Sequence, residues 1–253
     1  MKSNPINQMK KLSVVFFLTF FSCASITEEI YLNADGSGEY LVYSDVISST
    51  QSMMMGMMSG MYPDASEDSL RQIVDEQIWA EFPAEIDSII DFSGRVPDSI
   101  KNDPAKKKYL DKMEMFMKGS KAERYLNSGM RFSFRSIEDL QGFQDFMNEN
   151  QTATSGGMGM EMPSVNVKYS FDANSFSRVS DMEIKMDEND SSMLVLGELL
   201  KGSKSRLILH LPRKVKSVSK GLVVDQSGKD VIFEFDLIKV LNGEQSTDVK
   251  VEF

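Results

Sequence analysis

Alternating apolar and polar residues predict strands at both ends of the chain. The first two strands flank residues 33–38, where Asp35 and Gly36 are typical of the turn of a β-hairpin. The same turn has oxygen-bearing residues at alternate positions, as a calcium-binding loop would. Such a loop also needs a bidentate glutamate at a later position, which Ser44 occupies here. The pattern therefore favours a hairpin.

Apolar residues at helical spacing predict helices in the middle of the chain. One helix runs from a cap at Asp64 to about residue 81. A second opens at Asp103 and Pro104 and continues to Met117. A third is capped by Ser136 and carries its apolar residues on one side. These segments predict amphipathic helices that pack against a sheet.

The remaining segments predict further strands, one loop and one more helix. Strands are predicted at residues 130–135, 165–171, 175–179, 206–211, 215–218, 230–235 and 248–253. Residues 86–92 fit a short strand or a helix equally. Residues 191–201 predict a helix, and residues 148–164, rich in Asn, Ser, Gly and Met, predict a flexible loop.

The order of these elements predicts an α+β fold. Strands from both ends of the chain would form an antiparallel sheet, with several amphipathic helices from the middle packed against it. The chain is 41% hydrophobic, which is enough to bury one core. We therefore expect a single α+β domain over residues 23–253.

The first residues have the pattern of a secretory signal peptide. Three lysines precede an apolar run at residues 12–21, which ends at the small residue Ser22. The run is about half the ~20 residues that a membrane-spanning helix needs. Residues 1–22 are therefore predicted to be a cleaved signal peptide, with translation starting at Met1 or at Met9.

The only cysteine of the chain, Cys23, follows this run directly. Phe20, Phe21, Ser22 and Cys23 resemble the lipobox of bacterial lipoproteins, although both phenylalanines are larger than usual. The resemblance predicts lipid on Cys23, and several acyl chains on one residue give stable membrane attachment. The alternative is an ordinary signal peptide that leaves a free thiol. Ala24, rather than an aspartate, favours the outer membrane.

The net charge limits the classes of partner that we expect the protein to bind. Cleavage after residue 22 removes three lysines and no acidic residue, so the formal net charge moves from −10 to −13. A surface this acidic repels nucleic acid and anionic lipid headgroups. Acidic and basic residues are interspersed along the chain, which is typical of a solvated surface.

Segments at both ends also resemble one known family. The hairpin at residues 29–40 and the segments at 207–219, 227–237 and 241–243 resemble LppM-like bacterial lipoproteins. The match covers about a third of the chain, and it consists of strands and turns without a catalytic motif. The resemblance implies an envelope lipoprotein with a mixed α/β domain. Many relatives also carry a C-terminal membrane helix, which this sequence does not show.

The sequence lacks the common catalytic signatures. His210 is the only histidine and lies in a predicted strand between Leu209 and Leu211, so we expect it to face outward without a catalytic role. There is no Gly-x-Ser-x-Gly elbow, no phosphate-binding glycine loop and no His or Cys set for zinc. No cofactor and no metal is therefore expected.

Residues 51–61 contain six of the 19 methionines, and a second methionine group lies at residues 158–162. As a helix, the first segment places four of them on one face: Met54, Met57, Met58 and Met61. Such a face suits packing in a core or an interface, or an adaptable surface for an apolar ligand or partner. Together with the second group it would also suit Cu(I), which prefers soft sulfur ligands.

The leading hypothesis is a non-enzymatic lipoprotein of the bacterial envelope, held at the membrane through Cys23. It would bind an apolar ligand or another envelope protein, and no nucleic acid. Alternatives from other classes are an envelope hydrolase that uses carboxylates, which the sequence does not single out, and a methionine-rich Cu(I)-binding protein.

Overall fold

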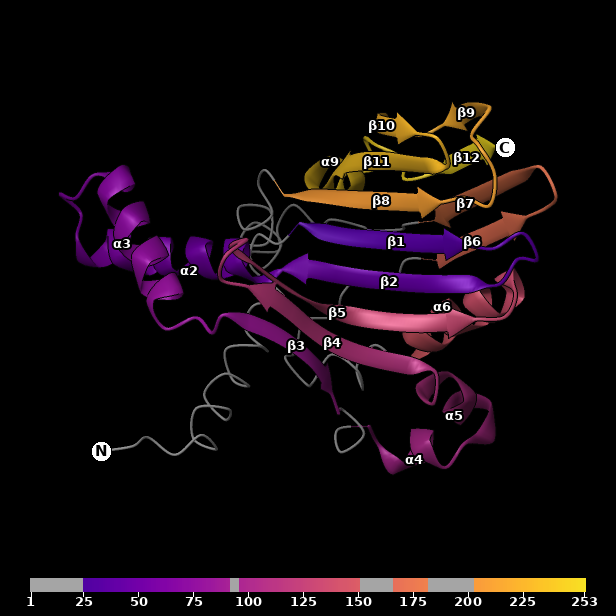
Figure 1. The fold of residues 1–253 in the computed structure, drawn as a ribbon, viewed down its shortest axis with the longest axis horizontal. Helices are drawn as coiled ribbons and strands as arrows, with labels where there is room; N and C mark the ends of the chain where they lie inside the picture. The colour runs from indigo at the N-terminus through magenta and orange to yellow at the C-terminus, as the bar shows by residue number, and fades with distance from the viewer. Residues whose placement is uncertain (1–24, 92–95, 151–165, 182–202) are drawn as a thin grey trace.

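The computed structural model describes residues 25–91, 96–150, 166–181 and 203–253. Within these ranges the chain is an α+β protein with two β-sheets, as the sequence predicts for the fold class (Figure 1). The larger sheet has eight strands in the order β10-β11-β8-β1-β2-β5-β4-β3. These strands are β1 (Ile26–Leu32), β2 (Gly38–Asp45), β3 (Glu85–Ile90), β4 (Met113–Ser120), β5 (Tyr125–Phe134), β8 (Lys204–His210), β10 (Val223–Ser227) and β11 (Asp230–Asp236).

Neighbouring strands of the larger sheet are antiparallel except at its centre, where β1 and β8 run parallel. The first strand of the domain therefore lies between a hairpin partner and a strand from the last quarter of the chain. Strands from both ends of the sequence thus meet, as predicted, although the parallel pair was not expected.

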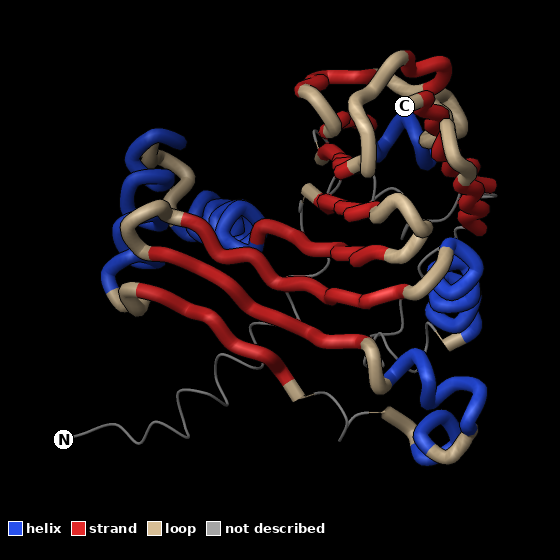
Figure 2. The backbone as a smooth tube through the Cα atoms, turned by 45° about the vertical axis from the view of Figure 1, so that its right-hand side comes forward, coloured by secondary structure: helices blue, strands red, loops and turns tan. Residues whose placement is uncertain are grey.

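The smaller sheet has four antiparallel strands in the order β6-β7-β12-β9. They are β6 (Asn166–Phe171), β7 (Ser175–Asp181), β12 (Val249–Glu252) and β9 (Ser217–Lys220). Together with α6 (Ile137–Glu149), this sheet covers one face of the larger sheet (Figure 2). The sequence analysis predicts one sheet, whereas the structure divides its strands between two layers.

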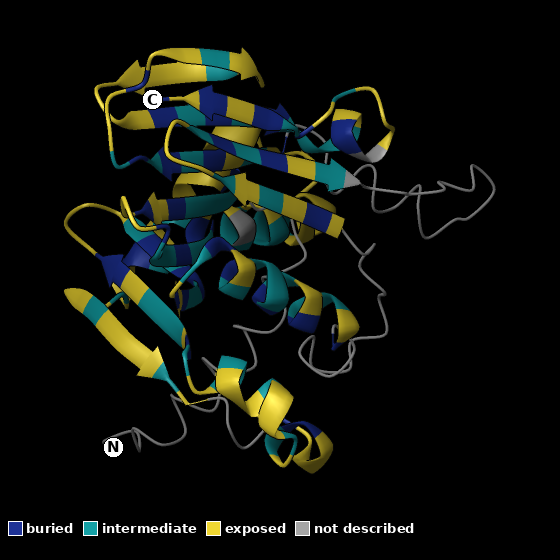
Figure 3. Ribbon diagram, turned by 90° about the vertical axis from the view of Figure 1, so that its right-hand side faces the viewer, coloured by how far each residue is buried: buried dark blue, intermediate teal, exposed yellow. Residues whose placement is uncertain are grey.

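The main core lies between these layers. Along β8, β11 and β12, buried positions alternate with more exposed ones, so one side of each of these strands points into the core (Figure 3). Phe132 of β5 stacks on Phe143 of α6 with ring centroids 3.9 Å apart. Phe176 of β7 and Phe233 of β11 are fully buried in the same cluster. Full burial of such rings contributes about 1.5–3 kcal/mol each.

The first hairpin confirms the local sequence signal. Leu32 pairs with Gly38 across the turn, and Gly36 has a φ of +82°, which glycine adopts without strain. The Asp35 side chain accepts hydrogen bonds from the Ser37 N–H and hydroxyl at 3.0 and 2.7 Å. The turn is thus fixed by its own residues, which is why a local pattern predicts it.

A helical hairpin follows β2 and extends beyond one end of the larger sheet (Figure 1). It consists of α2 (Val46–Met61), capped by Asp45, and α3 (Glu67–Ala80), capped by Ser66. The predicted cap at Asp64 is wrong by two residues. A second, smaller cluster of buried apolar residues lies at the base of the hairpin: Val46, Ile47, Trp79 and Leu126.

The helix predicted from Asp103 to Met117 is wrong beyond its first two turns. Asp103 does cap α5 (Pro104–Leu110), since its side chain accepts from the Ala105 N–H at 2.9 Å. The chain then enters β4, because β3 and β5 supply hydrogen-bonding partners on both sides. Tertiary pairing here outweighs the helical spacing of the apolar residues.

Several short elements complete the described chain. Residues 86–92, left open between strand and helix, form β3 up to Ile90. The short helices α4 (Asp98–Lys101) and α9 (Leu237–Leu241) and strand β10 were not predicted. Residues 148–150 belong to the end of α6, whereas the rest of the predicted loop and the helix at 191–201 lie outside the described residues. No helix in the described ranges is long and apolar enough to cross a membrane.

Candidate functional site

The helical hairpin carries a cluster of exposed apolar side chains. At the C-terminal end of α2, Met57, Met61 and Tyr62 are 62%, 67% and 53% exposed. We call these three residues the methionine surface. Met54 and Met58 are half-buried beside it, and no methionine of α2 is buried. The prediction of core packing is therefore wrong for this segment, which leaves an interface or a ligand surface.

The rest of α2 is uncharged and contains several small polar residues. No residue between Val46 and Met61 carries a charge. The hydroxyls of Thr50, Ser52 and Ser59 donate to helix carbonyls one turn earlier, at 2.7, 3.0 and 3.0 Å. The polar groups of these side chains are thus satisfied within the helix itself.

Asp75 of α3 holds the hairpin to the sheet. Its carboxylate accepts hydrogen bonds from Gln51 of α2 at 3.2 Å and from the Trp79 indole at 3.1 Å. It also pairs with Arg124, which lies between β4 and β5 with a φ of 58°. The hydrogen bond from Arg124 lowers the pKa of Asp75 below its usual value of 3.8. The hairpin is therefore attached by one polar junction and a small apolar cluster.

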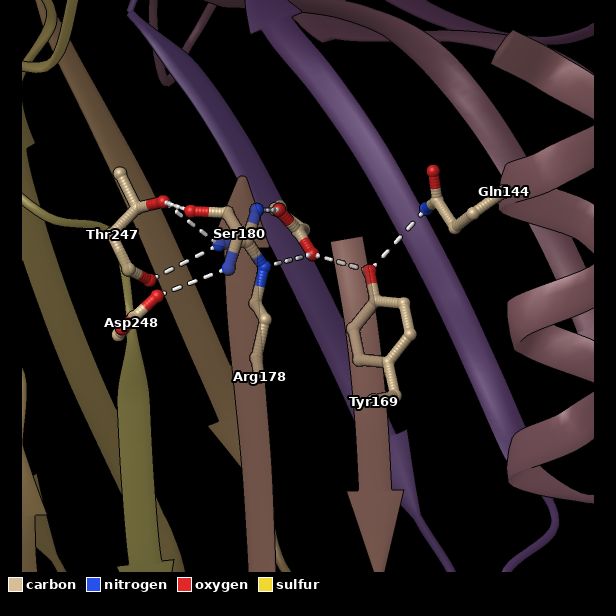
Figure 4. Close-up of polar contacts among 7 residues, drawn as sticks. Gln144, Tyr169, Arg178, Ser180, Thr247 and Asp248 are labelled. Carbon is tan, nitrogen blue, oxygen red and sulfur yellow. Dashed lines mark hydrogen bonds and ion pairs between the residues drawn. The ribbon is translucent and has the colours of Figure 1, made fainter. Parts of the chain in front are cut away.

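A buried polar network joins the two sheets (Figure 4). Arg178 of β7 donates to both carboxylate oxygens of Glu28 in β1, at 3.2 and 3.0 Å. The Tyr169 hydroxyl donates to the same carboxylate at 3.0 Å. Arg178 also donates to the backbone carbonyl and hydroxyl oxygens of Thr247 at 3.1 and 3.2 Å. The Arg178 and Glu28 side chains are only 9% and 13% exposed.

The charges of this network shift the pKa values of its own members. Burial alone would lower the pKa of Arg178, but the Glu28 carboxylate outweighs burial and raises it above the usual range. Burial, and then the charge of Glu28, raise the pKa of Tyr169 well above 10.0. The arginine therefore stays charged and the tyrosine neutral at all ordinary pH values. This arrangement connects the sheets, and neither the arginine nor the tyrosine is poised to exchange a proton.

The spacing of the two charged residues along their strands is a sequence signal for this pair. Glu28 is in phase with the buried Ile30 and Leu32 along β1, and Arg178 is in phase with the buried Phe176 along β7. Two residues of opposite charge on core-facing positions indicate a buried ion pair.

His210 lies on the opposite face of the larger sheet and is half-buried. Its Nδ1 is 2.8 Å from Asp230, and its Nε2 is 2.8 Å from Glu29. The ring stacks on Tyr31 with centroids 4.0 Å apart. Both nitrogens donate at once only in the protonated ring. The outward direction predicted for this residue is correct, whereas its two carboxylate neighbours come from strands that sequence alone does not bring together.

A hollow of about 530 Å³ lies between the ends of β3 and β4 and the helices α4 and α5. Its apolar lining includes Ile89, Leu110 and Met113. Lys101 and Lys107 at its rim are paired with aspartates of their own helical segments at 3.6 and 2.6 Å. The hollow has room for a small apolar molecule, and the carboxylates of Asp91 and Glu114 also belong to its lining.

No protein-family model and no curated protein matches the chain. A solved structure that matches is the NMR structure of the folded domain of LppM from Mycobacterium tuberculosis. The two chains share 12% identity with a TM-score of 0.39, over 91% of this chain and 89% of that one. A likeness of this strength carries no argument about function. Membership of an LppM-like family therefore stays a prediction from the sequence.

The other predicted site residues fall outside the described ranges. Cys23 and the methionine group at 158–162 belong to segments that the structure does not describe. Among the described residues, no group of histidine, cysteine or acidic side chains is arranged to hold a metal ion. The structure therefore does not test the anchor or the proximity of the two methionine groups, and the methionine surface is the part of the predicted site that it describes.

Proposed function

We propose that the protein is a non-enzymatic lipoprotein of the bacterial envelope, anchored through lipid on Cys23, which binds an apolar ligand or partner protein through the methionine surface. The observation that supports this most directly is that surface itself. Contiguous exposed apolar residues on an otherwise acidic protein mark sites of interaction. Flexible thioether side chains suit partners of varied shape.

The polar clusters support a binding role over a catalytic one. The Glu28–Arg178 network is paired throughout and buried between the sheets. Catalytic groups need a pKa near the working pH and access to substrate. Arg178 and Tyr169 have pKa values raised above their usual ranges and lie buried between the sheets, so the alternative of an envelope hydrolase gains no candidate residue from these two groups.

Metabolic labelling with an alkyne palmitate analogue tests the anchor. The full-length protein expressed in a bacterium should acquire the label and fractionate with membranes, with the outer membrane expected from Ala24. Cys23→Ala should abolish both results, while Ser25→Ala serves as a matched control that keeps them. A wild-type protein that remains unlabelled would rule out the proposed anchor.

Apolar-probe fluorescence tests the surface. Mild oxidation of methionine to its sulfoxide makes these side chains polar, so it should reduce binding of the probe. Met57→Gln with Met61→Gln should reproduce the loss, while Gln72→Ala on α3 should not. Stoichiometric Cu(I) binding that disappears when Met57, Met58 and Met61 become leucine would instead establish the copper alternative.

A further inference from the structure

The methionine surface and the proposed anchor belong to the same end of the molecule. Strand β1 begins at Ile26, and Ile26 pairs with Ser44 at the end of β2, two residues before α2 begins. Cys23 precedes Ile26 by three residues, which span about 10 Å at most. The helical hairpin extends beyond this same end of the sheet (Figure 1). A membrane that held Cys23 would therefore lie next to the hairpin.

The two helices of the hairpin differ in polarity. α2 has no charge over 16 residues, and its serine and threonine hydroxyls noted above bond to its own backbone. α3 begins with Glu67 and Asp68 and carries further acidic residues along its length. Within the hairpin, only α2 therefore offers an uncharged surface to a membrane interface, because charged side chains favour water.

We propose that α2 lies on the lipid bilayer, with Met57, Met61 and Tyr62 inserted among the upper acyl chains and headgroups. α3 then faces water. This inference rests on the proposed lipid anchor, which brings α2 close to the bilayer, and it names the bilayer as the apolar partner of the methionine surface. The acidic residues of α3 repel anionic headgroups, so the contact suits a zwitterionic surface. Burial of three such side chains adds a second point of attachment to that of the acyl chains.

Site-directed fluorescence tests the contact on the full-length, lipidated protein. Cys23 is the only cysteine, so a second cysteine becomes the only reactive thiol once Cys23 is lipidated. Met57→Cys and Met61→Cys would each carry an environment-sensitive fluorophore, and Gln72→Cys on the exposed side of α3 is the matched control. The labelled proteins are reconstituted in vesicles of phosphatidylcholine and phosphatidylethanolamine. One quencher is a lipid with a nitroxide near the top of its acyl chain, and the other is iodide in the water.

We expect emission from positions 57 and 61 to shift to shorter wavelength on reconstitution, with strong quenching by the nitroxide lipid and weak quenching by iodide. Position 72 should show the reverse. If all three positions respond alike to iodide while palmitate labelling is positive, the bilayer contact is disproved and the anchor stands. If palmitate labelling is negative, the proposed function itself fails. Shielding of positions 57 and 61 in detergent micelles, with crosslinking between copies, would assign the surface to a second copy and disprove the bilayer contact.

Discussion

The helical hairpin and the interface between the two sheets use the same kinds of residue for opposite purposes. In the interface, a charged pair and large apolar rings are buried and fully partnered. In the hairpin, α2 exposes apolar side chains, and Asp75 holds α3 to the sheet from a partly exposed position. The first region stabilises the fold, whereas the second leaves its apolar residues exposed. The difference predicts very different costs of substitution.

The largest loss of stability is expected from breaking the buried pair. Glu28→Leu leaves the Arg178 guanidinium charged without its carboxylate, which should lower the free energy of unfolding by about 3–5 kcal/mol. Chemical denaturation followed by circular dichroism measures this change. The double variant Glu28→Leu, Arg178→Leu removes both charges and should recover most of the loss. A single variant as stable as the wild type would show that the network contributes nothing to the interface.

A smaller loss is expected on the outer face of the larger sheet. His210→Gln keeps a polar side chain but loses the two carboxylate contacts and the stacking on Tyr31, so it should cost about 1 kcal/mol. Thermal melting should detect this, with the exposed Lys214→Gln as the control. Partner or ligand binding should not change. A variant that folds normally but loses a measured hydrolytic activity would show that the only histidine acts as a base.

The polar junction of the hairpin should matter less still, and it should depend on pH. Asp75→Asn weakens the pairing with Arg124 and should cost about 1 kcal/mol or less, because the pair is partly exposed. The folded pKa of Asp75 is lowered, so its contribution is present above the usual value of 3.8 and is lost as the pH falls. Trp79 is the only tryptophan, and its fluorescence should report looser attachment between about pH 5 and 2. A wild-type protein that responds like Asp75→Asn over this range would contradict the assignment.

The smallest effect is expected at the methionine surface. Met57→Gln and Met61→Gln should each change the free energy of unfolding by no more than about 0.5 kcal/mol, because these side chains are mostly exposed. Leu70→Ala in the same hairpin is the contrast, since Leu70 is buried and its truncation should cost about 2–5 kcal/mol. Equal effects at both positions would mean that the methionines pack in the folded protein.

Local signals predict the parts of this fold that local chemistry decides. The turn at Gly36 and the caps at Asp103 and Ser136 all occur where the sequence places them. The segment after Leu110 was misassigned because its apolar spacing fits a helix as well as a strand. Pairing with the two neighbouring strands decides in favour of a strand. A short stretch of sequence does not show which strands will be its neighbours.

The sequence predicts the composition of the methionine surface but not its exposure to solvent. The sequence identifies the methionine-rich segment and one helical face, yet it does not show that the sheet ends where α2 begins. The core therefore covers only the first turn of that helix, around Val46 and Ile47. The partners of His210 were missed for a similar reason, because Glu29 reaches it only through the parallel pairing of β1 with β8.

That parallel pairing also has a mechanical consequence. β1 is bonded along its length to β2 on one side and to β8 on the other. Under the proposed anchor, a force that is transmitted through the lipid along the strand enters at the first residue of β1. Such a force shears two rows of hydrogen bonds at once, whereas an edge strand would be peeled away one bond at a time. The strand nearest the proposed anchor is thus held on both sides, and a pull on that anchor has to break both rows of hydrogen bonds before the strand leaves the sheet.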